Sequence, residues 1–154
     1  MPFAYRLDHD LKIFYLVIYG HCTFSDIYSP SSSDPSTQPT NRPRVKFIID
    51  NTLGDLEIDT VGMTHFIQSM KDLKKTGFQL EPTAFLTTEK GLEIFIRSLE
   101  LLLDDGMSTY QAFSSLAEAL NWLDEVKNAE AIQQIRDTLL EKLISEHGVR
   151  PQFG

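Results

Sequence analysis

Short runs of strand-forming residues alternate along this chain with longer stretches that have the apolar spacing of helices. The strand-forming runs cover residues 44–50, 82–88 and 107–113, and the helical stretches cover 59–75, 89–103, 116–123 and 128–146. Apolar residues three and four positions apart give each helical stretch one apolar face. Because strands that alternate with helices are joined by right-handed crossovers, this order predicts an α/β fold with a mainly parallel sheet.

The start of the chain has a different pattern, that of a β-hairpin. Residues 4–8 alternate weakly, Asp8-His9-Asp10 is a turn sequence, and residues 11–19 are apolar on both alternating sets, with Gly20 at the end. This pattern predicts an N-terminal hairpin whose second strand is covered on both faces. Thr23 and Asp26 have the spacing of a capping box, so a short helix is expected next. Ser115 and Glu118 have the same spacing and predict the start of the helical stretch 116–123.

We divide the chain into a domain of residues 1–126 and a C-terminal helix and tail, 127–154. Within the domain, residues 29–43 carry four prolines among small polar residues, which predicts a flexible surface loop. The C-terminal helix has an apolar stripe that either covers the sheet or contacts a second copy of the chain. Because an exposed stripe of that size is unusual in a monomer, we predict a homodimer. The stripe consists of Ile132, Ile135, Leu139 and Leu143.

Charge and cysteine content restrict the class of protein. Fourteen Lys and Arg against 22 Asp and Glu give a formal net charge of −8, which disfavours nucleic-acid phosphates and anionic lipid surfaces as partners. Cys22 is the single cysteine, so an internal disulfide and a thiolate zinc cluster are excluded. The start of the chain is too charged for a signal peptide, and no apolar run approaches the roughly 18 residues of a membrane span. We therefore expect a cytoplasmic protein.

Catalytic motifs are absent from the sequence. Phosphate-binding loops, the nucleophile elbow and the zincin motif all lack a match. His21 and Cys22 are neighbours on a strand and should point to opposite faces, so we expect a buried thiol and no Cys–His nucleophile. Asp8, His9 and Asp10 are interpreted as turn residues, with a metal site as the less favoured reading. The sequence thus predicts a protein that is no enzyme and has no metal or cofactor.

One segment, Asp59-Thr60-Val61-Gly62-Met63, is a candidate interaction surface at the start of a helix. Asp59 is a natural N-cap, and Thr60 would follow in the first turn. A phosphate on Thr60 would meet free N–H donors there, so Thr60 is a candidate phospho-acceptor. Gly62 would allow the backbone of a partner to approach. The alternative interpretation is structural, with Asp59 as a cap and Gly62 relieving crowding.

Three stretches resemble one known family. They are YRLDHDLKIFYLVIYGHCTFSD near the start, the strand VKFIID, and STYQAFSSLAEALNWL, which contains the Ala-x-x-Trp-Leu pattern at residues 119–123. They are similar to the bacterial SpoIIAA-like proteins, which are related to STAS domains (sulfate transporter and anti-sigma-factor antagonist). The resemblance covers residues 5–123 and implies a mixed sheet of four or five strands wound with helices. The usual first helix is mostly replaced here by residues 29–43.

The resemblance also implies a role for the candidate segment. In anti-sigma-factor antagonists a segment of the form Ile-Asp-Ser-Ser-Gly-Leu opens the second helix, and a partner anti-sigma kinase phosphorylates its first serine. Ile58 to Met63 is similar, which would give the acceptor role to Thr60 and the supporting role to Asp59. Val61 stands at the second serine.

Three functional hypotheses remain open from the sequence. The first is a non-enzymatic regulatory module that binds another protein near Asp59 to Met63. The second is a carrier of a small apolar, lipid-like ligand, suggested by the Phe and Leu content of residues 89–103. The third is an enzyme of unrecognised type.

Overall fold

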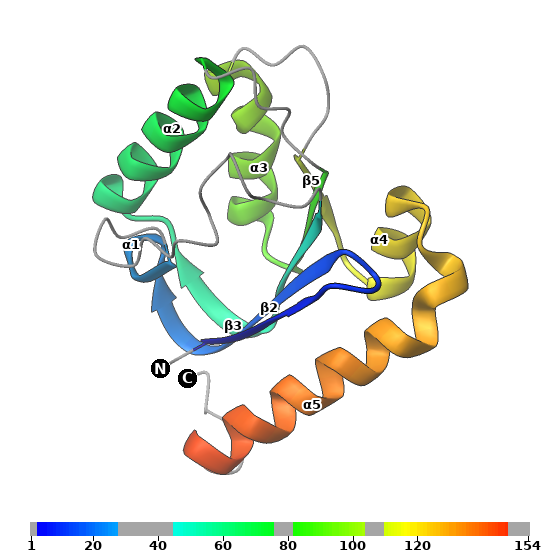
Figure 1. Ribbon diagram of the computed structural model, residues 1–154. Helices are drawn as coiled ribbons and strands as arrows, with labels where there is room; N and C mark the ends of the chain where they lie inside the picture. The colour runs from blue at the N-terminus through cyan, green and yellow to red at the C-terminus, as the bar shows by residue number, and fades with distance from the viewer. Residues whose placement is uncertain (1–2, 28–44, 76–81, 104–109, 148–154) are drawn as a thin grey trace.

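A computed structural model describes residues 3–27, 45–75, 82–103 and 110–147 of the chain, which form one five-stranded sheet with helices on both sides (Figure 1). The strands lie in sequence order in the sheet. β1 is antiparallel to β2, and each later strand is parallel to the one before it. This confirms the predicted α/β fold, with a mixed, mostly parallel sheet and an N-terminal hairpin. The strands are β1 (Phe3–Asp8), β2 (Ile13–Thr23), β3 (Lys46–Glu57), β4 (Thr83–Leu86) and β5 (Tyr110–Phe113).

The helices divide between the two faces of the sheet (Figure 1). α1 (Phe24–Ile27), α2 (Thr60–Lys75) and α3 (Lys90–Leu103) pack on what we call the α1–α3 face, over Leu16, Ile49 and Phe85. α4 (Leu116–Leu123), a short 3-10 turn η4 (Val126–Asn128) and α5 (Ala129–His147) pack on the opposite α4–α5 face, over Tyr15, Ile48 and Leu86. The strand residues of these two sets alternate because successive side chains of a strand point to opposite faces. No helix among the described residues is long and apolar enough to span a bilayer.

The C-terminal helix covers its own sheet. Its apolar stripe lies in the core of the α4–α5 face, and the four side chains are at most 6% exposed. Of the two arrangements that the sequence left open, the structure therefore has the first, and the stripe is not accessible to a second copy. The predicted dimer interface through these residues is corrected on this point, because β1 and β2 already bury them. The residues are Ile132 0%, Ile135 5%, Leu139 6% and Leu143 0%.

Strands β2 and β3 are longer than the sequence predicts. We expected β2 to end at Gly20 and β3 at Asp50, but Tyr19–Thr23 continues to pair with Leu53–Glu57. A bulge after Val17 shifts the register, and Gly20 accommodates the strand with a φ of 91°. The extension is stabilised by pairing with a distant segment, which local hydrophobicity does not reveal.

The predicted helix caps are confirmed. Thr23 Oγ1 accepts from Asp26 N at 3.2 Å and the Asp26 carboxylate accepts from Thr23 N at 2.9 Å, which is the reciprocal capping box. Ser115 Oγ accepts from Glu118 N at 3.3 Å at the start of α4. The predicted loop 29–43 lies outside the described residues, as does the first part of the run 107–113.

Candidate functional site

The candidate site begins with Asp59, which links two helices. One carboxylate oxygen accepts from Gly62 N at 3.2 Å, which confirms the predicted N-cap of α2. The other accepts from Ser25 N, in α1, at 2.9 Å. Hydrogen bonds from Ser25 and then from the backbone of Gly62 hold the pKa of Asp59 below its ordinary value. The carboxylate is therefore charged at neutral pH and fixed in position by both helices.

Thr60 and Val61 form the accessible part of the first turn of α2. The side chain of Thr60 is exposed, and Val61 is 59% exposed. An exposed aliphatic side chain beside an exposed hydroxyl gives this turn an apolar contact and a polar group that can be modified. The structure thus leaves both predicted residues available to a partner.

Gly62 and Met63 have internal roles instead. A Cβ on Gly62 would lie 2.5 Å from the backbone carbonyl carbon of Phe24 and closer still to the backbone nitrogen of Ser25. The backbone that approaches this glycine is therefore that of α1, which corrects the expectation that a partner approaches there. Met63 is partly buried and packs against the core of the α1–α3 face. Of the five residues of the predicted surface, Thr60 and Val61 are exposed, Asp59 and Met63 are half-buried, and Gly62 is buried.

Phe24 explains why α1 needs this close approach. Its ring is buried and lies 5.4 Å from the ring of Phe66 in α2 and 5.7 Å from that of Phe95 in α3. Such tilted and edge-on aromatic contacts add to the apolar burial that fixes one helix against another. The single turn of α1 is thus packed against the two long helices of its face.

Of the apolar residues of α3 that suggested a ligand carrier, Leu92, Phe95 and Ile96 contribute to the same core. Leu92 is 3% exposed and Ile96 is fully buried, while Ile94 is 64% exposed on the outer side of the helix. Core packing thus accounts for Leu92, Phe95 and Ile96. The side chains of residues 98–103 lie outside the described set.

His21 and Cys22 lie on opposite faces of β2, as the sequence predicts. Cys22 is fully buried in the core of the α1–α3 face, and burial, with Asp26 beside it, raises the pKa of its thiol to about 12. His21 is exposed, with Nδ1 3.2 Å from a carboxylate oxygen of Asp55. The thiol is therefore protonated at neutral pH and separated from the imidazole, so this pair has no nucleophile.

The hairpin turn has the geometry that its sequence suggests. Asp8 Oδ1 accepts from the backbone nitrogens of Asp10 and Leu11, at 3.0 and 2.9 Å. This carboxylate stabilises the turn, as in an Asx turn. Across the described residues, no group of three or more His, Cys, Asp or Glu side chains is placed to hold a metal ion.

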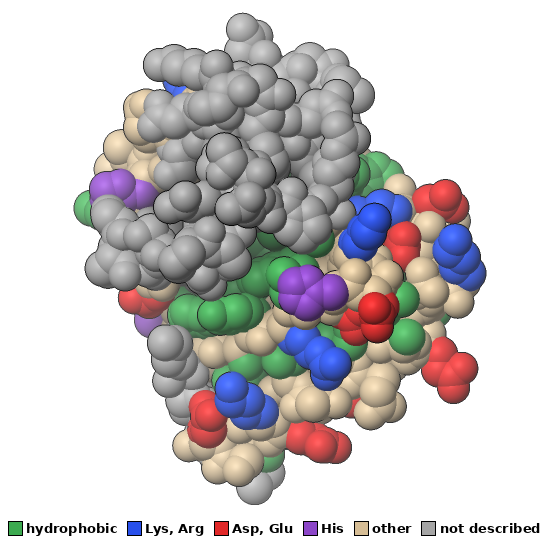
Figure 2. Space-filling view, viewed as in Figure 1, with side chains coloured by type: hydrophobic (Ala, Val, Ile, Leu, Met, Phe, Trp, Pro, Cys, Tyr) green, Lys and Arg blue, Asp and Glu red, His purple; other side chains and the backbone are tan. Residues whose placement is uncertain are grey.

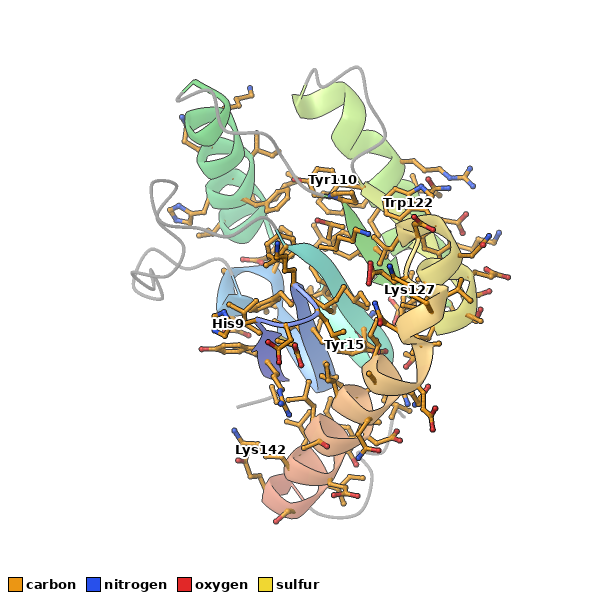
Figure 3. The ribbon with its side chains drawn as sticks, turned by 45° about the vertical axis from the view of Figure 1, so that its right-hand side comes forward. His9, Tyr15, Tyr110, Trp122, Lys127 and Lys142 are labelled. Carbon is orange, nitrogen blue, oxygen red and sulfur yellow. The ribbon has the colours of Figure 1, made fainter. Side chains whose placement is uncertain are left out.

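A buried polar cluster on the α4–α5 face was not predicted from the sequence. Asp50 is fully buried, and one of its carboxylate oxygens accepts from the hydroxyl of Tyr15 at 2.7 Å and from Arg136 Nε at 2.6 Å. Its other oxygen accepts from the backbone and the hydroxyl of Thr52. Burial and the Asp50 charge raise the pKa of Tyr15 far above its ordinary value. Figure 3 shows Tyr15 between the strands and α5.

A second polar contact joins the start of β3 to the turn after α4. Lys46 Nζ lies 2.9 Å from a carboxylate oxygen of Glu125 and also donates to the carbonyl of Leu123. The other carboxylate oxygen of Glu125 accepts from Asn128 Nδ2 at 2.9 Å. Glu125 is only 8% exposed. The polar atoms of these groups are paired with one another through hydrogen bonds, so we assign them a structural role.

Comparison with solved structures finds chains of similar fold. No protein-family model matches the chain, and no curated protein matches it. A solved structure of an uncharacterized protein from the DUF3478 family of Shewanella loihica, described as having a SpoIIAA-like fold, is 18% identical with a TM-score of 0.46. The match covers 79% of this chain and 93% of that chain.

Proposed function

We propose that this chain is a regulatory module that binds another protein through the first turn of α2, with Thr60 and Val61 as the contact residues. The observation that supports this proposal is the division within the segment. Internal contacts hold Asp59, Gly62 and Met63 in place, and these three residues support the turn. Thr60 and Val61 are exposed on that turn. A preorganised turn with exposed side chains binds at a lower entropic cost than a loop.

We further propose that phosphorylation of Thr60 controls this binding. A phosphate adds a charge of about −1.5 to −2 and three acceptor oxygens at a helix N-terminus, where free N–H donors favour an anion. The charged carboxylate of Asp59 precedes Thr60, so the modified turn would become strongly negative. A partner that contacts Val61 through an apolar surface would then be repelled. By the family resemblance, the partner class is an anti-sigma-type kinase.

The test is phosphorylation with a matched control. The purified chain is incubated with ATP and candidate kinases of the anti-sigma type, and the modified residue is located by mass spectrometry. We expect phosphate on Thr60, loss of it in Thr60→Ala, and retention in Thr64→Ala, which removes an exposed threonine one turn later in α2. Phosphate confined to other residues would contradict the role of Thr60.

Binding itself is tested with Val61. For a kinase that binds the unmodified chain, Val61→Asp should weaken binding about tenfold or more, because it places a charge in an apolar contact. Ile94→Asp is the control, since Ile94 is equally exposed but lies on α3. Equal binding of the two variants and the unchanged chain would exclude the α2 turn as the contact.

A further inference from the structure

One edge of the sheet is a strand without a neighbour among the described residues. The strand order begins with β1, so this strand pairs with β2 on one side only. All six residues of β1 are in register with β2, without a bulge. Figure 1 shows β1 at the outer side of the sheet. The free edge is therefore regular over its full length.

This edge has only some of the features that usually protect an edge strand. Proteins shield such edges with charged side chains, proline, a bulge or a very short strand, and β1 has the charged residues Arg6 and Asp8. Phe3–Asp8 contains no proline and no bulge. The opposite edge, β5, has four residues in contrast to the six of β1. Of the two edges, β1 therefore offers the longer run of backbone groups for pairing.

An aromatic row on the α1–α3 face leads to this edge. The ring of Tyr5 stacks on Phe14 with centroids 5.4 Å apart, and Phe14 contacts Phe47 at 5.5 Å. Tyr5 is 55% exposed, Phe14 and Phe47 are half-buried, and Thr83 and Tyr110, farther along the same row, are 7% exposed. Exposure thus increases toward β1 and is greatest at the edge.

The gradient follows the lengths of the described helices on this face. The connections from β3 to β4 and from β4 to β5 contain helices of 16 and 14 residues, whereas the described helix after β2 has four. Among the described helices, none lies over the aromatic row at β1. In Figure 2 hydrophobic side chains are visible beside this edge.

We propose that β1 pairs with β1 of a second copy of the chain, antiparallel and around a two-fold axis through Tyr5, so that the two sheets form one continuous sheet of ten strands. Such an axis stands perpendicular to the sheet and preserves its faces. Residues directly opposite in an antiparallel pair share a face. In an allowed register, odd-numbered residues of one β1 therefore face odd-numbered residues of the other, and even-numbered residues face even-numbered ones.

An axis at Tyr5 or at Arg6 pairs the longest part of β1, whereas one at Ala4 or Leu7 pairs a shorter part, and the side chains select between the first two. With Tyr5 opposite Tyr5 of the second copy, Phe3 faces Leu7 and Ala4 faces Arg6, so the α1–α3 face joins apolar residues only. With Arg6 at the axis, two arginines would face each other, and like charges directly opposite are destabilising. Pairing at Tyr5 also joins the two aromatic rows across the axis, from Phe47 of one copy to Phe47 of the other.

This dimer goes beyond the proposed function and does not depend on it. Because the axis preserves the faces, the α2 turns of the two copies would lie on the same side of the ten-stranded sheet. Two Thr60–Val61 surfaces on one side would allow a dimeric partner to bind twice, with the gain in avidity that linkage provides. The dimer also leaves α5 on its own sheet.

The first test is the mass in solution. Sedimentation equilibrium at micromolar concentration should give twice the 17.6 kDa of one chain. Tyr5→Lys places two ammonium groups opposite each other and should raise the dimer dissociation constant about tenfold or more. Ile94→Lys adds the same charge at an exposed residue of α3 and should leave the mass doubled. A monomeric unchanged chain, or equal dimerisation of both variants, would overturn the proposal.

The second test is register-specific and does not depend on how well Tyr5→Lys folds. Tyr5→Cys should form an intermolecular disulfide under mild oxidation, because the two residues are directly opposite. Arg6→Cys should not, because the two cysteines would be offset along the strands beyond the roughly 7 Å limit for Cα atoms. Cys22 is buried and does not compete. Absence of cross-linking at Tyr5→Cys, or equal cross-linking of both variants, would overturn the register.

Discussion

Helices cover both faces of the sheet, but the two coverings are held in different ways. On the α4–α5 face, Arg136 and Lys46 form ion pairs with the buried acids Asp50 and Glu125, and α5 lies along β1 and β2. On the α1–α3 face the helices pack through aromatic rings and the shared cap Asp59, and Tyr5 and Val61 remain exposed. The α4–α5 covering thus contains buried ion pairs, whereas among the described residues the α1–α3 covering has only exposed ones; exposed apolar side chains occur on both, with Val126 and Ile144 on the α4–α5 side.

This difference indicates that the α4–α5 face mainly stabilises the fold and that the α1–α3 face mainly provides the binding surface. Buried charged contacts are costly to break and fix one arrangement of α5, so variants on the α4–α5 face should change the stability of the fold. Variants at exposed residues of the α1–α3 face should change binding with little effect on folding. Substitutions on each face test whether effects on stability and effects on binding can be separated in this way.

Arg136→Met should be the most destabilising of these substitutions. It leaves the Asp50 carboxylate buried without its cation, and breaking a buried pair in this way costs about 3 to 5 kcal/mol of unfolding free energy. Urea unfolding measures the change. Arg97→Met is the control, because the Arg97–Glu93 ion pair is exposed and such pairs contribute about 0 to 1 kcal/mol. Similar losses of unfolding free energy for the two variants would show that the Asp50–Arg136 pair stabilises the fold no more than an exposed ion pair does.

The double variant Asp50→Asn with Arg136→Met separates the cost of an unpaired buried charge from the loss of packing. Removing the charge of both partners should recover part of the loss, since an uncompensated buried carboxylate is the main cost of the single change. Recovery distinguishes this cost from the loss of apolar packing by the arginine stem. No recovery would assign the effect to packing.

Gly62→Ala should have an intermediate effect on the other face. The added methyl group would collide with the backbone of Phe24 and Ser25, and overpacking of this kind costs about 1 to 3 kcal/mol. Gly91→Ala is the matched control, because a Cβ there has no neighbour within 4 Å. In α3 this control should be neutral or stabilising by up to about 1 kcal/mol. Comparable losses for both glycines would mean that α1 does not constrain Gly62.

Local patterns predicted the elements of this fold, and long-range pairing determined what they missed. Helical spacing and capping residues such as Ser115 are contained in a few neighbouring residues, so the helices were predicted close to their observed bounds. The extension of β2 past Gly20 depends on pairing with residues more than 30 positions later, which no local pattern records. The apolar character of that part of β3 is also interrupted by Gly54 and Asp55.

The candidate site shows the same limit. Asp59 was predicted as an N-cap because the cap and its helix are adjacent in sequence. Its second bond, to Ser25, and the contact of Gly62 with α1 join residues 34 or more positions apart and could not be predicted. The Asp50–Arg136 pair spans 86 residues. In the sequence, the only local indication of this pair was Asp50, an acidic residue at the end of the predicted apolar strand 44–50.

The smallest expected effect concerns pH and Asp59. The folded chain lowers the pKa of this carboxyl, so its contribution to stability is present above the pKa of the unfolded chain, about 3.9, and is lost as the pH falls through the folded value. Asp59→Ala should therefore be less stable than the unchanged chain at pH 7, and the difference should narrow below about pH 3.9. Urea unfolding at both pH values measures it. Asp59→Asn keeps one acceptor oxygen, for Ser25 N or for Gly62 N but not for both, and should lose less at pH 7 than Asp59→Ala. A difference that stays constant with pH would show that the charge of Asp59 does not hold α1 and α2 together, and the α1–α3 face would then depend on its aromatic contacts alone.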